Sequence, residues 1–231
     1  MRYLVPFFYW TGLAAIRAAI FVLVRVEVVG RENMPLRGAL IVAANHLNNA
    51  DPPLIASRMP RRLVYMAKDE MFQWPVMGFL TRLTGAFPVK RSEADIGALR
   101  KATKVLESGQ VLAMFPEGTR GIEAKLGPAQ PGTALLALRS EAPILPIAIT
   151  GTEAVHFPKI FLDFLRLRRP RIRIVVGRPF FLPPVSRISA EEVSRCTDLI
   201  MGRIAALLPP SYRGEYAQAG AAAEANAERA P

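Results

Sequence analysis

His46 and Asp51 are the two residues of this sequence best placed to transfer a proton. They stand five positions apart in a run that reads NHLNNAD. Five residues correspond to about 140° around an α-helix and to opposite faces of a β-strand, so the two side chains can meet only across a turn. The asparagines favour a turn, and Pro52 and Pro53 keep Asp51 out of a helix interior. A neutral histidine can then take a proton from an alcohol while the carboxylate holds its tautomer.

A second run, with the sequence FPEGTR, places Glu117 71 residues after His46. Gly118 permits a backbone turn that is closed to other residues. Arg120 can hold a phosphate through two parallel hydrogen bonds, and Thr119 adds a hydroxyl. The alternative for this run is a local structural salt bridge between Glu117 and Arg120. The run therefore indicates a phosphate site that complements the histidine and the carboxylate.

Together the two runs resemble the signature blocks of the glycerolipid acyltransferase family, specifically the lysophosphatidic acid (1-acylglycerol-3-phosphate) acyltransferases. The resemblance implies that His46 is the base, that Asp51 orients it, and that a lysophospholipid hydroxyl attacks an acyl thioester directly. It also implies that the second run binds the glycerol phosphate of the acceptor, with Glu117 contacting the glycerol or orienting Arg120. The residues implied for that role are Glu117, Gly118, Thr119 and Arg120.

Weaker matches to the same family lie between and after the two runs. The run FPVKR resembles a segment with a phosphate-binding arginine, which would be Arg91. Lys68 fits a family lysine near the site, although a solvated surface lysine is the alternative. The run PILP at residues 143–146 resembles the last, apolar block, which equally suits a core strand. The resemblance implies no metal and no cofactor, because coenzyme A or acyl carrier protein arrives as part of the acyl donor.

The resemblance therefore implies an enzyme that acylates the sn-2 hydroxyl of 1-acylglycerol 3-phosphate to give phosphatidic acid, a step of phospholipid biosynthesis. Alternatives within the same chemistry are other acceptors: glycerol 3-phosphate, another lysophospholipid or an aminolipid. A metal-dependent hydrolase using His46, Asp51 and Glu117 is a different class, but it lacks a second well-placed histidine and its site would be positively charged. A non-catalytic membrane-binding protein would leave the histidine–aspartate pair unexplained.

The composition bounds the partners. The chain has 231 residues, of which 51% are apolar, and this is enough for one domain with a sizeable core. Its net charge of +11 favours anionic partners such as phosphate head groups, an acidic membrane or an acidic carrier protein. No nucleic-acid motif is visible, so nucleic acid is not expected. Cys196 is the only cysteine, which excludes a disulfide within the chain, and its helical spacing predicts a core thiol.

Short strands alternate with helices after residue 24, which predicts an α/β fold with a largely parallel sheet covered by helices. The resemblance implies the same fold, that of the glycerol-phosphate acyltransferases. His46 should then stand at the carboxyl edge of its strand, where such sheets place their sites. Strands are expected at 25–29, 39–44, 63–67, 111–115, 144–150 and 171–176, and helices at 92–108, capped by Ser92, at 133–140, and at 190–208, capped by Ser189 with Glu192.

Three regions are expected: a membrane-associated N-terminal helix at 1–24, an acyltransferase domain at 25–213, and a disordered alanine- and glycine-rich tail at 214–231. The apolar N-terminal segment is about long enough to span a bilayer. Because Arg17 interrupts it, we favour a helix lying at the interface, with the guanidinium reaching the phosphates; a span or a buried core helix are the alternatives. The expected location is the cytoplasmic face of the cell membrane.

Two further stretches bear on the membrane. The apolar stretch 71–83 suits either the core or an amphipathic wall that receives the acyl chain. The stretch 166–173 holds five arginines and follows Phe161, Phe164 and Leu165. It suits either a solvated charge run or a contact with anionic lipid. The only other histidine, His156, has no carboxylate pattern around it beyond Glu153 and is expected to be structural.

Overall fold

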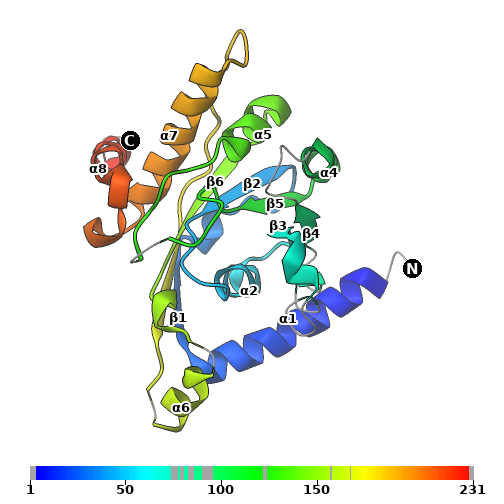
Figure 1. Ribbon diagram of the computed structural model, residues 1–231, viewed down its shortest axis with the longest axis vertical. Helices are drawn as coiled ribbons and strands as arrows, with labels where there is room; N and C mark the ends of the chain where they lie inside the picture. Colours follow the sequence, from blue (N-terminus) through cyan, green and yellow to red (C-terminus); the bar gives the residue numbers. More distant parts are fainter. Residues whose placement is uncertain are drawn as a thin grey trace.

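A sheet of seven strands forms the centre of the molecule (Figure 1). The computed structural model describes residues 4–73, 78, 81–82, 86–89, 96–121, 124–156, 158–166 and 168–228. All six expected strands are present, and a seventh, β4, was not predicted. The strands are β1 (Arg25–Val29), β2 (Leu40–Ala44), β3 (Leu63–Lys68), β4 (Phe87–Val89), β5 (Val111–Met114), β6 (Ile144–Thr150) and β7 (Arg171–Val176).

The strand order is β1-β7-β6-β2-β5-β3-β4, and five neighbouring pairs are parallel. Only β6 and β7 run antiparallel. The prediction of a largely parallel α/β sheet is therefore confirmed. β7 runs antiparallel to β6, and β1 runs parallel to β7. The amino ends of β1 and β7 therefore share one edge of the sheet with the carboxyl ends of β2, β5 and β6. We call this the carboxyl edge.

Helices cover both faces of the sheet, and the alternation along β2 shows why. Leu40 and Val42 belong to one buried cluster together with residues of α1, α2 and α6. Ile41 and Ala43 belong to a second cluster together with residues of α4, α5 and α7. Both faces of this central strand are apolar, as a strand covered twice requires. The helices are α1 (Leu4–Leu23), α2 (Asp51–Arg58), α4 (Ile96–Glu107), α5 (Gly132–Ser140), α6 (Lys159–Leu165), α7 (Ala190–Ala206) and α8 (Ala217–Glu228).

The N-terminal segment is helical, as predicted, and α1 lies across one side of the domain beneath α2 (Figure 1). Leu13 of α1 is only 2% exposed. Arg17 donates from Nε to the carbonyl of Ser57 in α2 at 2.6 Å. The expectation that Arg17 reaches lipid phosphates is therefore wrong, because its guanidinium is bound to the neighbouring helix. Within the described part of the chain, no helix combines the length and the apolar character needed to cross a bilayer.

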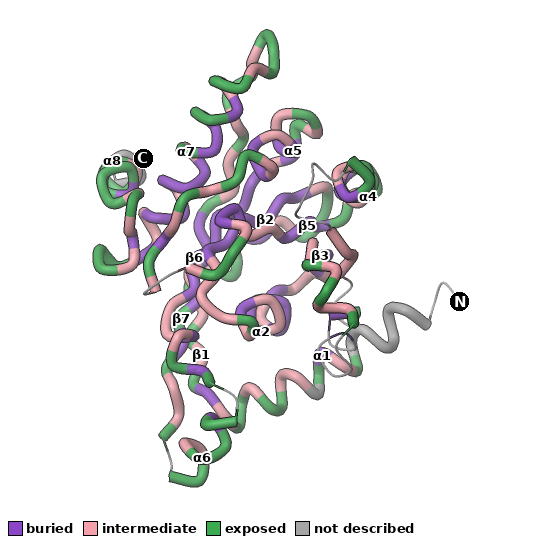
Figure 2. The backbone as a smooth tube through the Cα atoms, viewed as in Figure 1, coloured by how far each residue is buried: buried purple, intermediate pink, exposed green. Residues whose placement is uncertain are grey.

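The prediction of a disordered tail is wrong for residues 214–228, since α8 packs along α7. Alanine has the highest helix propensity, and small residues let the two helices approach closely. A Cβ atom on Gly220 would lie 2.8 Å from the Cβ of Ala205. An ion pair of 2.6 Å between Arg213 and Glu224 fixes the helix further. Figure 2 shows the buried side of α7 and the more exposed α8 next to it.

The predicted capping box at the start of α7 is formed only in part. Ser189 caps α7 by accepting the N–H of Glu192 at 3.2 Å, whereas the carboxylate of Glu192 turns to Arg195. Cys196 is buried in the core, as expected. The stretch 71–83 is described only at 71–73, 78 and 81–82, so the two alternatives for it lie outside the described residues, as does the cap at Ser92.

Candidate active site

Asp51 is fully buried and holds the loop that carries His46. One oxygen, Oδ2, lies 2.9 Å from Nδ1 of His46. The same oxygen accepts the backbone N–H groups of Leu47, at 2.6 Å, and Asn48, at 2.7 Å. Beside the two backbone donors, this oxygen can accept a hydrogen bond from Nδ1–H of a neutral imidazole. The Nε2 atom is thereby left as the acceptor, which is the form that a base requires.

The local sequence explains this turn. His46 stands two residues after the last residue of β2, at the carboxyl edge, and α2 begins at Asp51 with proline in its first turn. Both predictions, a turn between the two residues and a position outside a helix interior for Asp51, are confirmed. Asn48 accepts the N–H of Ala50 at 3.0 Å and donates to the carbonyl of Val155 at 2.9 Å. The loop is therefore tied to the segment that follows β6.

Asn45 provides a second anchor that the sequence interpretation missed. Its side chain is buried and bonds both backbone groups of Ile149 in β6, donating to the carbonyl at 2.9 Å and accepting the N–H at 2.8 Å. An amide that matches both groups of one strand residue extends the ladder beyond the end of β2. The sequence did contain a signal for this anchor, namely an asparagine at the end of a buried strand, next to His46. A buried side-chain amide must find hydrogen-bond partners for both its oxygen and its nitrogen.

The imidazole of His46 lies on the ring of Phe115, the first residue of the FPEGTR run. Their centroids are 4.2 Å apart and the planes differ by 23°. Phe115 in turn stacks on Tyr65 of β3 at 6.1 Å. With Nδ1 held by Asp51 and one ring face covered by Phe115, the His46 side chain remains 14% exposed. The ring is thus fixed in orientation and still open to a substrate hydroxyl.

Glu117 joins the two runs through their backbones. Its Oε1 accepts the N–H of His46 at 2.9 Å and its Oε2 accepts the N–H of Gly127 at 3.1 Å. In return, the carbonyl of His46 accepts the N–H of Gly121 at 2.7 Å. Glu117 is only 4% exposed, and burial raises the pKa of its carboxyl group. Both oxygens thus accept backbone N–H groups of the protein, and the expected contact of Glu117 with glycerol or with Arg120 stays a prediction.

The FPEGTR run makes the predicted turn. Gly118 adopts a φ of +68°, and its N–H donates to the carbonyl of Phe115 at 3.0 Å. Thr119 and Arg120 follow as exposed residues, so their side chains are available to a ligand. The salt bridge between Glu117 and Arg120, which was the structural alternative, is not formed among the described residues.

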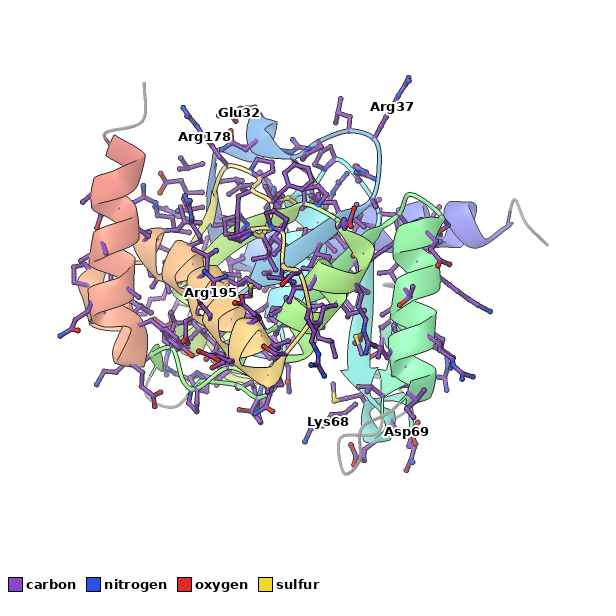
Figure 3. All side chains as sticks on the ribbon, turned by 90° about the horizontal axis from the view of Figure 1, so that it is seen from above. Glu32, Arg37, Lys68, Asp69, Arg178 and Arg195 are labelled. Atoms are coloured by element: carbon purple, nitrogen blue, oxygen red, sulfur yellow. The ribbon has the colours of Figure 1, made fainter. Side chains whose placement is uncertain are left out.

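Two predicted site residues remain, Lys68 and Arg91, and only Lys68 is among the described residues. Lys68 ends β3 at the same edge of the sheet and is exposed. Figure 3 shows it at the end of β3, on the side opposite Glu32, Arg37 and Arg178. Arg91 lies outside the described residues. In the described part of the chain, no group of three or more histidine, cysteine, aspartate or glutamate residues is arranged to hold a metal ion.

The loop that supplies Gly127 is held by the C-terminal segment, which the sequence interpretation missed. The carbonyl of Tyr212 accepts the N–H of Leu126 at 2.9 Å, and the hydroxyl of Tyr216 accepts the N–H of Ala129 at 3.2 Å. The hydroxyl of Tyr212 donates to Glu153 at 2.6 Å. Burial and this carboxylate raise the pKa of Tyr212 to about 12, so the phenol remains a neutral donor. No sequence signal marked these contacts, because each joins residues that are more than 50 positions apart in the chain.

Comparison with known proteins places this geometry in a family. Residues 25–150, more than half of the chain, match the family model described as Acyltransferase. The chain belongs to the acyltransferase family. Both runs of this acyltransferase lie inside the matched region, whereas α6, β7, α7 and α8 lie beyond it. The family predicted from the two runs is thereby confirmed.

Individual relatives agree. This acyltransferase is 26% identical over 181 residues to the 1-acyl-sn-glycerol-3-phosphate acyltransferase of Bacillus subtilis (strain 168), covering 78% of this chain and 86% of that one. It is 32% identical over 164 residues to the enzyme of the same name from Limnanthes alba, covering 70% of this chain but only 54% of the plant protein. The chain thus spans about half the length of its plant relative.

The fold agrees with a solved structure. The crystal structure of the 1-acyl-sn-glycerophosphate (LPA) acyltransferase PlsC from Thermotoga maritima superposes with a TM-score of 0.62 at 24% sequence identity. The superposition covers 85% of this chain and 76% of that one. At this identity the likeness shows the fold alone.

Proposed function

We propose that this protein transfers a fatty acyl group from an acyl thioester to the sn-2 hydroxyl of 1-acylglycerol 3-phosphate, giving phosphatidic acid. The observation that carries the proposal is the oriented pair of His46 and Asp51, tied through Glu117 to the turn that presents Arg120. The names of the relatives from Bacillus subtilis and Limnanthes alba support the same acceptor.

The chemistry follows from the geometry of His46. Its Nε2 takes the proton of the acceptor hydroxyl while the hydroxyl oxygen attacks the carbonyl carbon of the thioester. The buried anion of Asp51 stabilises the imidazolium that forms. When the carbon–sulfur bond breaks, the imidazolium returns the proton to the departing thiolate. The products are an ester and a free thiol, so the reaction balances without a metal or a cofactor and without a nucleophile from the protein.

The acceptor phosphate is assigned to the turn that follows Glu117. Arg120 and Thr119 are exposed there and present a cation and a hydroxyl. Lys68 lies at the same edge of the sheet, and Arg91 completes the set that we assign from the sequence. Glu117 and Gly118 shape this turn. The exposed guanidinium suits a phosphate group that approaches from outside the domain.

We place the reaction at the cytoplasmic face of the cell membrane, where a lysolipid acceptor meets a water-soluble acyl donor. The association is monotopic in this proposal, with α1 lying at the interface. The donor is acyl-coenzyme A or acyl carrier protein, since both are anionic and the protein carries a net charge of +11.

An acceptor panel tests the proposal. Purified protein is incubated with either acyl donor and with 1-acylglycerol 3-phosphate, glycerol 3-phosphate, lysophosphatidylcholine or an aminolipid, and the products are measured by mass spectrometry. Phosphatidic acid should form from 1-acylglycerol 3-phosphate at the highest rate, with release of one thiol per ester. Preferred acylation of another acceptor would overturn the acceptor assignment. Thiol release without any ester would favour the hydrolase alternative.

A further inference from the structure

The carboxyl-terminal end of α1 and the helix α6 expose apolar side chains to an unusual degree. Of the ten large apolar side chains exposed in the described residues, five belong to these two segments. In a soluble region such side chains would be scattered, whereas their grouping indicates a surface that binds something apolar. They are Phe21 (73% exposed), Val22 (44%), Phe161 (50%), Leu162 (55%) and Leu165 (75%).

The two segments form one surface although they are about 140 residues apart. Figure 1 shows α6 beside the end of α1, and the two helices are in contact. Arg169, which follows α6, donates to the carbonyls of Phe21 and of Val24, the latter at 2.9 Å. Its guanidinium also lies over the ring of Phe21, 5.9 Å from the centroid. Arg169 therefore joins α6 to α1, so the apolar side chains of the two segments are exposed next to each other. We call this the α1–α6 surface.

Arginines without a carboxylate partner border the α1–α6 surface. Arg166 and Arg168 follow α6 and are exposed. Arg25 and Arg171 begin β1 and β7 at directly paired positions, and both are exposed. Among the described residues none of these four forms an ion pair, whereas Arg173 lies 3.9 Å from Glu27. Like charges on paired strand positions repel each other, so an anion at this border would stabilise them.

The position of this surface relative to the site follows from the strand directions. Because β7 is antiparallel to β6, with Thr150 opposite Arg173, the start of β7 lies at the carboxyl edge of the sheet. His46 leaves β2 at that same edge. A lipid that enters the site from a bilayer bound to the α1–α6 surface would therefore approach from the correct edge.

We propose that the α1–α6 surface docks on an anionic lipid bilayer, with its apolar side chains in the interface and the four arginines on the lipid phosphates. This inference rests on the proposed function, because a surface that binds a bilayer serves an enzyme whose acceptor is a membrane lipid. An apolar patch bordered by arginines fits this partner, because each basic residue adds attraction to anionic lipid while apolar side chains add burial. A second copy of the chain is a poorer partner, because a two-fold dimer through this surface would place arginines of one copy against arginines of the other. An acidic protein could pair with the arginines but would not bury the apolar side chains of Phe21 and Leu165.

Vesicle flotation of the full-length protein without acyl donor tests the docking. One set of vesicles contains phosphatidylcholine alone and the other contains added phosphatidylglycerol. Binding should be stronger to the anionic vesicles and should weaken at high salt. Changing both Arg166 and Arg168 to Gln should lower the partition coefficient by about fivefold per arginine. Changing both Leu162 and Leu165 to Ser should lower it by roughly tenfold or more on both kinds of vesicle.

A matched pair of changes at the opposite edge serves as the control. Phe181 is 68% exposed, and it follows the bridge between Ile144 and Phe180 at the amino end of β6. Arg178 lies near it and is labelled in Figure 3. The variants Phe181→Ser and Arg178→Gln should bind vesicles as the unchanged protein does. Circular dichroism and melting temperature establish that every variant is folded.

The outcomes separate this proposal from the proposed function. If folded variants of the α1–α6 surface bind vesicles as tightly as the controls, the docking surface is wrong, even if the protein makes phosphatidic acid. If these variants lose vesicle binding but the unchanged protein makes no phosphatidic acid, the docking surface stands and the function is wrong. If the exposed side chains instead mediate self-association, analytical ultracentrifugation will show dimers that the serine variants lose, and this result would also overturn the proposal.

Discussion

The side chain of Glu117 accepts the backbone N–H of His46 at 2.9 Å, across 71 residues of sequence. Its second oxygen accepts the N–H of Gly127, so one buried carboxylate fixes both His46 and the loop that follows the turn at Gly118. Glu117 is thus a positioning residue. Its removal should affect the placement of His46 more than the affinity for the acceptor.

Replacing Glu117 tests this role. Glu117→Gln keeps one acceptor oxygen but turns an NH₂ group toward a backbone donor, and Glu117→Ala leaves two buried N–H groups without partners, at about 1–3 kcal/mol each. Both variants should lower kcat by about tenfold or more and should change the acceptor KM less. A large rise in acceptor KM at constant kcat would show that Glu117 binds the acceptor directly.

The raised pKa of Glu117 predicts a specific pH dependence of stability. Between its ordinary value of 4.5 and its higher folded pKa, the native state binds more protons at this site than the unfolded state. The contribution of Glu117 to the free energy of unfolding therefore falls as pH rises through this window and is constant above it. Unfolding midpoints should be compared between the unchanged protein and Glu117→Gln over this range. The difference should fall with rising pH, and a difference that rises would contradict the assignment.

His46→Ala should lower kcat by at least about 10²-fold, the usual size of a general-base contribution. His156→Ala is the matched control, because His156 is exposed and makes none of the contacts of the site. Asp51→Asn should also lose activity, since it can hydrogen-bond the imidazole but does not stabilise its charge. Near-normal turnover by a folded His46→Ala protein would exclude His46 as the base.

Arg120→Ala should raise the KM for the phosphate-bearing acceptor on the order of tenfold, with a smaller effect on the acyl donor. Lys68→Ala should show a weaker effect of the same kind, because an ammonium group makes one contact where a guanidinium makes two. Arg100→Ala is the control, because Arg100 is an exposed residue on the outer face of α4. A selective rise in the donor KM would instead assign Arg120 to the phosphates of coenzyme A.

The sequence predicted those features of the fold and of the site that depend on residue types at short spacing along the chain. The strands and the turn between His46 and Asp51 followed from residue types and spacing, and the family followed from the resemblance of the two runs to known signature blocks. The role of Glu117 did not, because its partners are backbone N–H groups, which every residue type except proline carries. The helix α8 was missed for a similar reason, since its alanine-rich sequence shows no amphipathic period and becomes ordered through close packing of Gly220 on Ala205.

The attachment of the Gly127 loop to Tyr212 and Tyr216 bears on when the enzyme becomes competent during synthesis. The ribosome adds Tyr216 170 residues after His46. At about 5–20 residues per second, this interval lasts about 10–30 seconds. Throughout it, the histidine loop has been made but the tyrosines that hold its partner loop have not. The nascent chain, whose α1 segment is made before the histidine loop, therefore has time to reach a bilayer before its catalytic centre is complete.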